Sequence, residues 1–161
     1  MDEELQEIIE QQRIHWPESF HELLTPFFHT LHRAHGVILG QAFKVMGHHD
    51  LSPAEFDVLA SLRRSAPPHE MTPSQLQKAL LLTSGGLTKV LQELERRHLI
   101  TRSTAMEDRR VKPVRLTVDA LPLVEQVMNS MIRQVGGWIE TSLSSREIEE
   151  ITIILLKLTK T

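Results

Sequence analysis

The feature that most constrains the fold is a series of helix starts followed by a charged hairpin, all within residues 52–117. Ser52-Pro53-Ala54-Glu55 is a capping box with proline at the first helical position, and Thr72-Pro73-Ser74-Gln75 repeats the arrangement. Further along the chain, Ser144-Ser145-Arg146-Glu147 is a third instance without the proline. Helices are expected over 52–64, 72–81 and, capped by Thr83, over 83–97. A loop is expected over 66–70, and two strands over 99–104 and 112–116 around a charged turn.

Two short helices followed by a basic hairpin is the order of elements in a winged helix-turn-helix. The chain should therefore be mainly α-helical with a small β-hairpin wing. The reading unit, which is the part expected to contact DNA, should lie between about Ser52 and Thr117.

Apolar stripes of helical period flank this unit on both sides. The upstream stripe, near Thr25-Pro26, consists of Leu24, Phe28, Leu31, His35, Ile38, Ala42 and Val45. The downstream stripes consist of Leu121, Val124, Met128, Met131, Val135 and Trp138, then Ile148, Ile151, Leu155 and Leu158. These stripes predict N- and C-terminal dimerisation helices, with packing inside one chain as the alternative. The expected organisation is 1–47, 48–117 and 118–161, within one compact domain.

Charge is distributed unevenly along the 161 residues, whose net charge is −3. Residues 83–115 hold 8 basic and 4 acidic side chains, a net charge of +4, and the rest of the chain sums to −7. A positive segment on an acidic body is typical of a nucleic-acid-binding surface, with an ordinary solvated surface as the alternative.

Several classes of protein are excluded or disfavoured by composition. The chain has no cysteine, which excludes disulfides and thiolate metal sites. The acidic N-terminus lacks the pattern of a signal peptide, and no apolar run reaches the roughly 18 residues of a membrane span. No phosphate loop, nucleophile elbow or H-E-x-x-H motif is present. We therefore expect a cytoplasmic protein without a membrane partner, a cofactor or an enzymatic activity.

The expected contact residues lie at the start of the third helix and at the hairpin tip. Only the N-terminal end of a recognition helix enters the major groove, so that end should carry small and polar side chains. The residues assigned to DNA binding are Thr83, Ser84, Gly85, Thr88, Lys89, Arg109, Arg110 and Lys112. Gly85 and Gly86 let the backbone approach DNA closely, and Asp108 should orient an arginine of the wing. The alternatives are a fraying helix end and a solvated turn.

The combined motifs resemble those of the MarR family of bacterial regulators. They are Leu51-Ser-Pro-Ala-Glu-Phe-Asp-Val-Leu59, Leu82-Thr-Ser-Gly-Gly-Leu-Thr-Lys89, Leu94-Glu95, His98-Leu99-Ile100 and Asp108-Arg-Arg with Val114-Arg-Leu-Thr117. The resemblance covers roughly residues 20–131 and implies a homodimer that binds a pseudo-palindromic DNA site, usually as a repressor released by a small aromatic or anionic ligand. His98 and Ala120 stand where the family usually has glycine.

The Thr83-Ser-Gly-Gly-Leu-Thr88 segment and an N-terminal helix carrying Trp16 look like the urate-responsive, PecS-like branch. That resemblance assigns Trp16, Arg33 and Asp57 to an effector site. The branch's fourth residue, an arginine, falls on Val90, which argues against urate itself. Packing of Trp16 and a structural hydrogen bond for Asp57 are the alternatives.

Nine histidines leave other functions open. His29, His32 and His35 step by three along one helix, with His21 upstream, and such imidazoles can bind zinc. However, no paired carboxylate completes a site, so a metal-responsive regulator and a pH-sensitive dimer interface are secondary hypotheses. A zinc-dependent enzyme and a winged-helix protein-interaction module without DNA binding are further alternatives.

Overall fold

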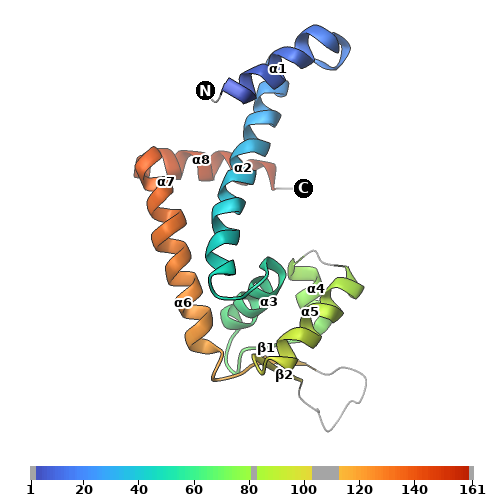
Figure 1. Cartoon of the computed structure of the whole chain (residues 1–161), viewed down its shortest axis with the longest axis vertical. Coiled ribbons are helices and arrows are strands. Elements are labelled where there is room, and N and C mark those ends of the chain that lie inside the picture. The colour runs from blue at the N-terminus through green and yellow to red at the C-terminus, as the bar shows by residue number, and fades with distance from the viewer. Residues whose placement is uncertain (1–2, 81–82, 103–112, 160–161) are drawn as a thin grey trace. The chain divides into compact units, whose positions relative to one another are not determined.

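The computed structural model describes residues 3–80, 83–102 and 113–159, which form two compact units that divide between residues 42 and 43 (Figure 1). The first unit contains α1 (Glu3–His15), the 3-10 helix η1 (Pro17–Ser19) and the first part of α2 (Leu24–Gly47). Trp16 lies between α1 and η1, so the expectation that the N-terminal helix carries it is wrong. Pro17 explains this ending, because the residue before a proline is biased away from helical backbone.

The second unit contains the remaining helices and a small sheet. After the end of α2 come α3 (Pro53–Arg64), β1 (Glu70–Met71), α4 (Pro73–Leu80), α5 (Ser84–Arg96), β2 (Ile100–Arg102) and β3 (Val114–Leu116). They are followed by α6 (Leu121–Met131), a π-helical turn η2 (Ile132–Gly136), α7 (Gly137–Ser142) and α8 (Ser145–Leu158). This order confirms the mainly helical winged helix-turn-helix architecture.

The capping residues read from the sequence begin their helices as expected. The Ser52 hydroxyl accepts a hydrogen bond from Glu55 N, and the Glu55 carboxylate accepts one from Ser52 N, which closes the capping box of α3. Thr72 caps α4 in the same way with Gln75, and Ser144 caps α8 with Glu147. The hydrogen bonds from Ser144 hold the pKa of the Glu147 carboxyl below its ordinary value.

The core of the second unit lies where α3 contacts α4, α5, α6 and β3. The fully buried side chains include Leu59, Leu62, Leu76, Leu94, Ile100, Val114 and Val127. These residues come from all of the elements that surround α3. The recognition helix is therefore anchored to the same core that holds the wing.

The sheet has three antiparallel strands in the order β1-β3-β2. The expected loop at 66–70 is wrong at its end, because Glu70 pairs with Arg115 in β1. The return strand expected over 112–116 is present as Val114–Leu116 among the described residues, and residue 112 lies outside them. Pro113 has no N–H to donate to a ladder. In the first strand, pairing extends over Ile100–Arg102 among the described residues, and residues 103–104 lie outside them.

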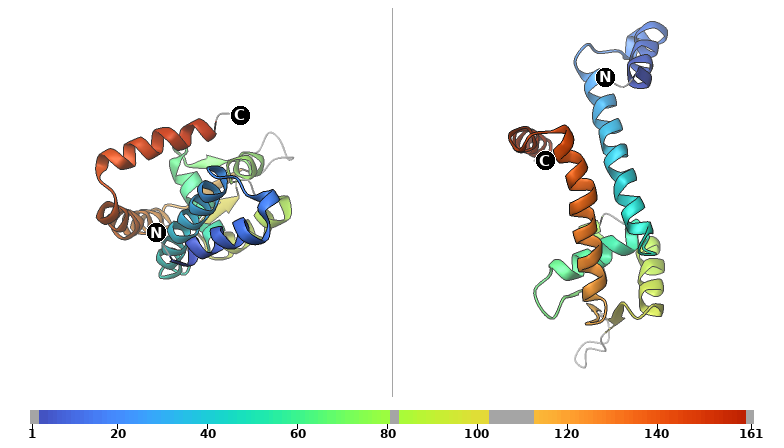
Figure 2. Two further views of the ribbon diagram at one scale, coloured as in Figure 1. Left: turned by 90° about the horizontal axis from the view of Figure 1, so that it is seen from above. Right: turned by 60° about the vertical axis from the view of Figure 1, so that its left-hand side comes forward.

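Helix α6 has Pro122 in its first turn. It continues through η2 into α7 as one uninterrupted helical segment, as Figure 2 shows. The π-helical turn ends at Gly136, the first of two adjacent glycines that weaken helical structure. Helix α8 follows with no buried residue in its whole length. Among the residues that the structure describes, none of the helices combines the length and the apolar character that crossing a membrane requires.

Candidate nucleic-acid interface

The start of α5 is an exposed, capped helix end. Thr83 has extended backbone, and its hydroxyl accepts a hydrogen bond from Gly86 N at 3.2 Å. Ser84 is the first helical residue, and its side chain lies outside the described set. Gly85, Thr88 and Lys89 are exposed. The opposite face of α5 is fixed in the core by Leu87, Leu91 and Leu94, which are buried.

The two adjacent glycines of α5 have different surroundings. A Cβ added to Gly85 would meet no described atom within 4 Å, so this position is open. A Cβ added to Gly86 would lie 3.1 Å from the Thr83 hydroxyl oxygen, the atom that caps the helix. The space next to Gly86 is therefore tighter than the space next to Gly85. The caps of α3, α4 and α8 have Glu55, Gln75 and Glu147 at the corresponding position, so the cap itself does not require glycine.

Much of the positive charge of residues 83–115 is held in ion pairs. The partners, with their nitrogen–oxygen distances, are Arg96–Glu93 at 2.6 Å, Arg97–Glu55 at 3.2 Å, Arg102–Glu95 at 3.2 Å and Arg115–Glu70 at 2.8 Å. The hydrogen bonds from Arg96 hold the pKa of the Glu93 carboxyl below its ordinary value. Within the described part of the segment, Lys89 is the basic residue for which no carboxylate partner is found.

Asp108, Arg109, Arg110 and Lys112 lie outside the described residues. They stand in the sequence between β2 and β3, whose pairing ends at Arg102 and Val114.

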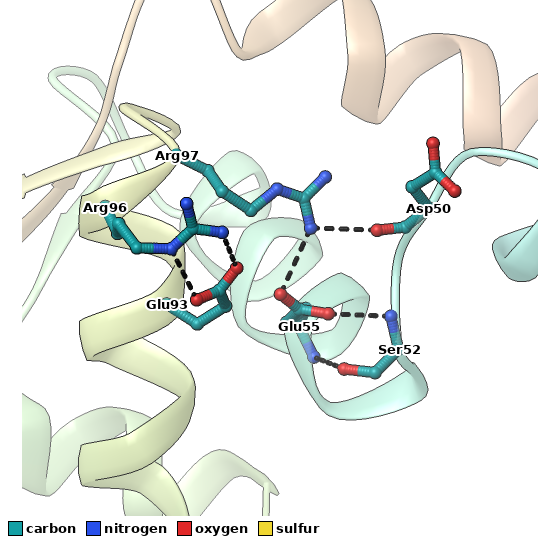
Figure 3. Close-up of polar contacts among 6 residues, drawn as sticks. All are labelled: Asp50, Ser52, Glu55, Glu93, Arg96 and Arg97. Carbon is teal, nitrogen blue, oxygen red and sulfur yellow. Dashed lines mark hydrogen bonds and ion pairs between the residues drawn. The ribbon is translucent and has the colours of Figure 1, made fainter.

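The other end of α5 is tied to the start of α3, a relationship that the sequence analysis missed (Figure 3). Arg97 Nη1 donates to the Asp50 carbonyl oxygen at 2.8 Å and to Glu55 Oε1 at 3.2 Å. His98 follows with φ 58°, a left-handed backbone that glycine adopts more readily. The helix thus ends as it would with the expected glycine, although the residue is histidine. No local spacing signals the Arg97–Glu55 contact, because the residues are 42 positions apart.

The expected effector residues fall in both units. In the first unit the Trp16 side chain is exposed, and the Arg33 guanidinium pairs with the Glu4 carboxylate. In the second unit, burial raises the pKa of the Asp57 carboxyl, and the positive charge of Arg64 partly opposes the shift. Trp16 and Arg33 thus belong to the first unit, and Asp57 belongs to the second.

A pocket of about 520 Å³ lies between α3 and α6 in the second unit. Its lining combines apolar and charged side chains from the two helices: Ala60, Arg63, Arg64, Val124, Glu125, Met128 and Asn129. Arg63 is paired with Glu125 at 2.8 Å across the two helices. Asp57 lies two helical turns before Arg64, on the same face of α3.

Two histidines of the first unit, His21 and His29, form ordinary hydrogen bonds. His29 Nε2 lies 2.8 Å from Gln12 Oε1, and His21 Nδ1 accepts from the backbone N–H groups of Leu23 and Leu24. Among the residues that the structure describes, no three histidines or carboxylates are grouped so that they could hold a metal ion.

Comparison with known proteins identifies the family of this chain. Residues 49–111 match the model of the MarR family. The HTH-type transcriptional regulator PecS of Dickeya dadantii (strain 3937) is 32% identical over 129 residues, which are 80% of this chain and 77% of PecS.

Two solved structures share the fold. AbsC, a MarR family transcriptional regulator from Streptomyces coelicolor, has a TM-score of 0.78 at 18% identity, covering 88% of this chain and 95% of AbsC. BpsR of Bordetella bronchiseptica, whose DNA binding is regulated by 6-hydroxynicotinic acid, has a TM-score of 0.69 at 26% identity, covering 83% and 92%. With its capped recognition helix and three-stranded wing, this chain belongs to the MarR family of DNA-binding transcriptional regulators.

Proposed function

We propose that the chain is a homodimeric repressor that binds a pseudo-palindromic DNA site and is released by a small aromatic or anionic ligand. The observation that carries the DNA-binding part is the geometry of α5. Its N-terminal end is exposed and capped, whereas Leu87, Leu91 and Leu94 anchor its inner face. A helix held in this way can enter a major groove without losing its packing.

Each contact residue has a defined role in this proposal. Lys89 neutralises a phosphate, Thr88 and Ser84 donate hydrogen bonds to bases or phosphates, and Gly85 allows close approach of the backbone. In the wing, Arg109, Arg110 and Lys112 contact the phosphates or the minor groove, with Asp108 orienting an arginine. These assignments follow from the sequence and the family.

The DNA-binding proposal is tested with duplexes selected by the protein from a pool of genomic fragments. Lys89→Ala should weaken binding several-fold and flatten the dependence of affinity on salt, because one phosphate contact is lost. Arg96→Ala is the matched control: it removes a cation from the other end of the same helix, where Glu93 already compensates the charge. An identical salt dependence in wild type and Lys89→Ala would remove Lys89 from the interface. If no fragment is retained at low salt, the chain is a protein-interaction module instead.

The homodimer is supported by apolar surface on the terminal helices. In α8, Ile153, Ile154, Leu156 and Leu158 are each at least half exposed in the single chain. In the first unit, Leu24, Phe27 and Phe28 of α2 are also exposed. Monomeric soluble proteins rarely expose apolar surface on this scale. We therefore assign dimerisation to residues 1–47 and 118–161, and DNA binding to 48–117.

The effector part is supported by the α3–α6 pocket and by the relatives. A volume of about 520 Å³ is within the range of small-molecule sites. The exposed Arg64 guanidinium is available to an anionic group, and Val124 and Met128 provide apolar surface for a ring. Regulation of BpsR by an aromatic acid shows that a similar chain responds to this chemical class. Trp16, Arg33 and Asp57 are the other proposed contacts, as the family resemblance implies.

A ligand screen tests the effector proposal. Urate and a panel of hydroxylated aromatic acids are added to the preformed complex with selected DNA, and release is followed by fluorescence anisotropy. A releasing compound should lose potency in Arg64→Ala if the α3–α6 pocket is its site, and in Asp57→Asn if the residue that the family resemblance assigns also contacts it. Lost potency in Arg33→Ala or Trp16→Ala alone would place the ligand in the first unit instead.

A further inference from the structure

One side chain, Arg97, connects the end of the recognition helix to the start of α3. Its Nη1 atom donates to the Asp50 carbonyl oxygen at 2.8 Å and to Glu55 Oε1 at 3.2 Å. The Glu55 residue is 8% exposed. The Arg97 side chain is 24% exposed. A pair with one buried partner is screened less by water than a fully exposed pair, which contributes little to stability.

The same carboxylate has a second role in the cap of α3. Its Oε2 atom accepts the hydrogen bond of Ser52 N at 2.8 Å. The capping box fixes the carboxylate relative to the first turn of α3, so Arg97 binds a preformed acceptor. The backbone of α3 is therefore connected through the Glu55 carboxylate to Arg97, the residue that caps the C-terminal end of α5.

The neighbouring arginine provides a contrast in the same view (Figure 3). Arg96 donates to both carboxylate oxygens of Glu93, at 2.9 Å and 2.6 Å, within its own helix. This pair connects α5 only to itself. Two adjacent arginines thus have different roles: Arg96 compensates a charge on α5, and Arg97 fixes the position of the helix.

We infer that Arg97 is a positioning residue for DNA recognition. Arg97 and Lys89 are eight residues apart, which is about 12 Å along a helix. A tilt of about 5° at the tied end would move the reading end by about 1 Å, which exceeds the distance range of a good hydrogen bond. Hydrogen bonds from α5 to base edges should therefore depend on Arg97, although its guanidinium is paired with Glu55 inside the protein. This inference rests on the proposed DNA-binding function of α5.

The test compares selected DNA with a scrambled duplex of the same length. In Arg97→Ala, affinity for the selected duplex should fall about tenfold, while affinity for the scrambled duplex and the salt dependence stay as in wild type. Arg97→Lys, which keeps one donor group in reach of Glu55, should recover part of the loss. Arg96→Ala should leave both affinities unchanged. An equal loss on both duplexes with a flatter salt dependence would instead make Arg97 a phosphate contact and overturn the inference.

A double-mutant cycle and a measurement without DNA complete the test. If the two side chains act together, Glu55→Gln with Arg97→Ala should lower selected-duplex affinity no more than Arg97→Ala alone. Hydrogen exchange should be faster at the end of α5 in Arg97→Ala but not in Arg96→Ala. If wild type selects no duplex from the genomic fragments, the proposed function alone is refuted. If hydrogen exchange at the end of α5 is unchanged in Arg97→Ala, the positioning role is refuted. If Arg97→Ala does not fold, Arg97→Lys and Arg97→Met are compared in its place.

Discussion

The hydroxyl oxygen of Thr83 accepts a hydrogen bond from Gly86 N at 3.2 Å and would lie 3.1 Å from a Cβ at Gly86. The capping hydroxyl therefore crowds the space next to Gly86 but not the space next to Gly85. Alanine normally stabilises a helix over glycine by about 1 kcal/mol. At Gly86 the hydroxyl must shift by a few tenths of an ångström to admit a methyl group, which opposes part of that gain.

The first prediction compares alanine at the two adjacent glycines. Gly85→Ala should raise the free energy of unfolding by up to about 1 kcal/mol, because the position is open and helix propensity improves. Gly86→Ala should gain less than Gly85→Ala, because the capping hydroxyl of Thr83 must shift to admit the methyl group. Urea denaturation of the two variants measures this difference, and equal gains would contradict the role of Thr83. If α5 approaches DNA closely at Gly85, the more stable Gly85→Ala protein should also bind selected DNA more weakly.

The helix starts of this chain could be predicted because their signals are local. Each predicted cap is present: a side-chain hydroxyl accepts a hydrogen bond from the backbone N–H three residues later, at Ser52, Thr72, Thr83 and Ser144. The tie between Arg97 and Glu55 could not be predicted in this way, because it depends on how two helices pack. The two-residue strand Glu70–Met71 was missed for the same reason, since its partner Arg115 lies 45 positions away.

The second prediction concerns the apolar surface of α8. Ile154 and Leu158 are one helical turn apart and are 55% and 60% exposed in the single chain. If they pack in a homodimer, the double variant Ile154→Asp with Leu158→Asp should shift the protein to monomers, because buried unpaired carboxylates are costly. Sedimentation velocity measures the shift, with Glu149→Gln on the same helix as the control. A double variant that stays dimeric would remove this face of α8 from the interface.

The third prediction follows from the raised pKa of Asp57. Burial disfavours the ionised carboxylate in the folded protein, so the cost is present at neutral pH and disappears as the pH falls below about 4, the unfolded value. Asp57→Asn should therefore raise the free energy of unfolding at pH 7 by less than about 1 kcal/mol, a small gain because the residue is partly exposed to solvent. The gain should vanish near pH 3.

Urea denaturation at the two pH values measures the Asp57 effect. The exposed Asp119 provides the control variant Asp119→Asn. A gain for Asp57→Asn that persists unchanged at pH 3 would show that the amide improves packing and that ionisation is not the cause.

The last prediction concerns His98, where this chain departs from the glycine usual in its family. The backbone there has φ 58°, so a residue with a Cβ pays roughly 1 kcal/mol for the left-handed conformation. His98→Gly should remove that strain and raise the free energy of unfolding by about 0.5–1 kcal/mol, after allowance for the greater freedom of glycine in the unfolded chain. His98→Ala keeps the Cβ and should show no such gain, which separates backbone strain from loss of the imidazole. Equal stabilities of the glycine and alanine variants in urea denaturation would mean that residue 98 is not strained. Because the substitution leaves the contacts of Arg97 with Asp50 and Glu55 in place, the stabilised His98→Gly protein should keep the affinity of wild type for selected DNA.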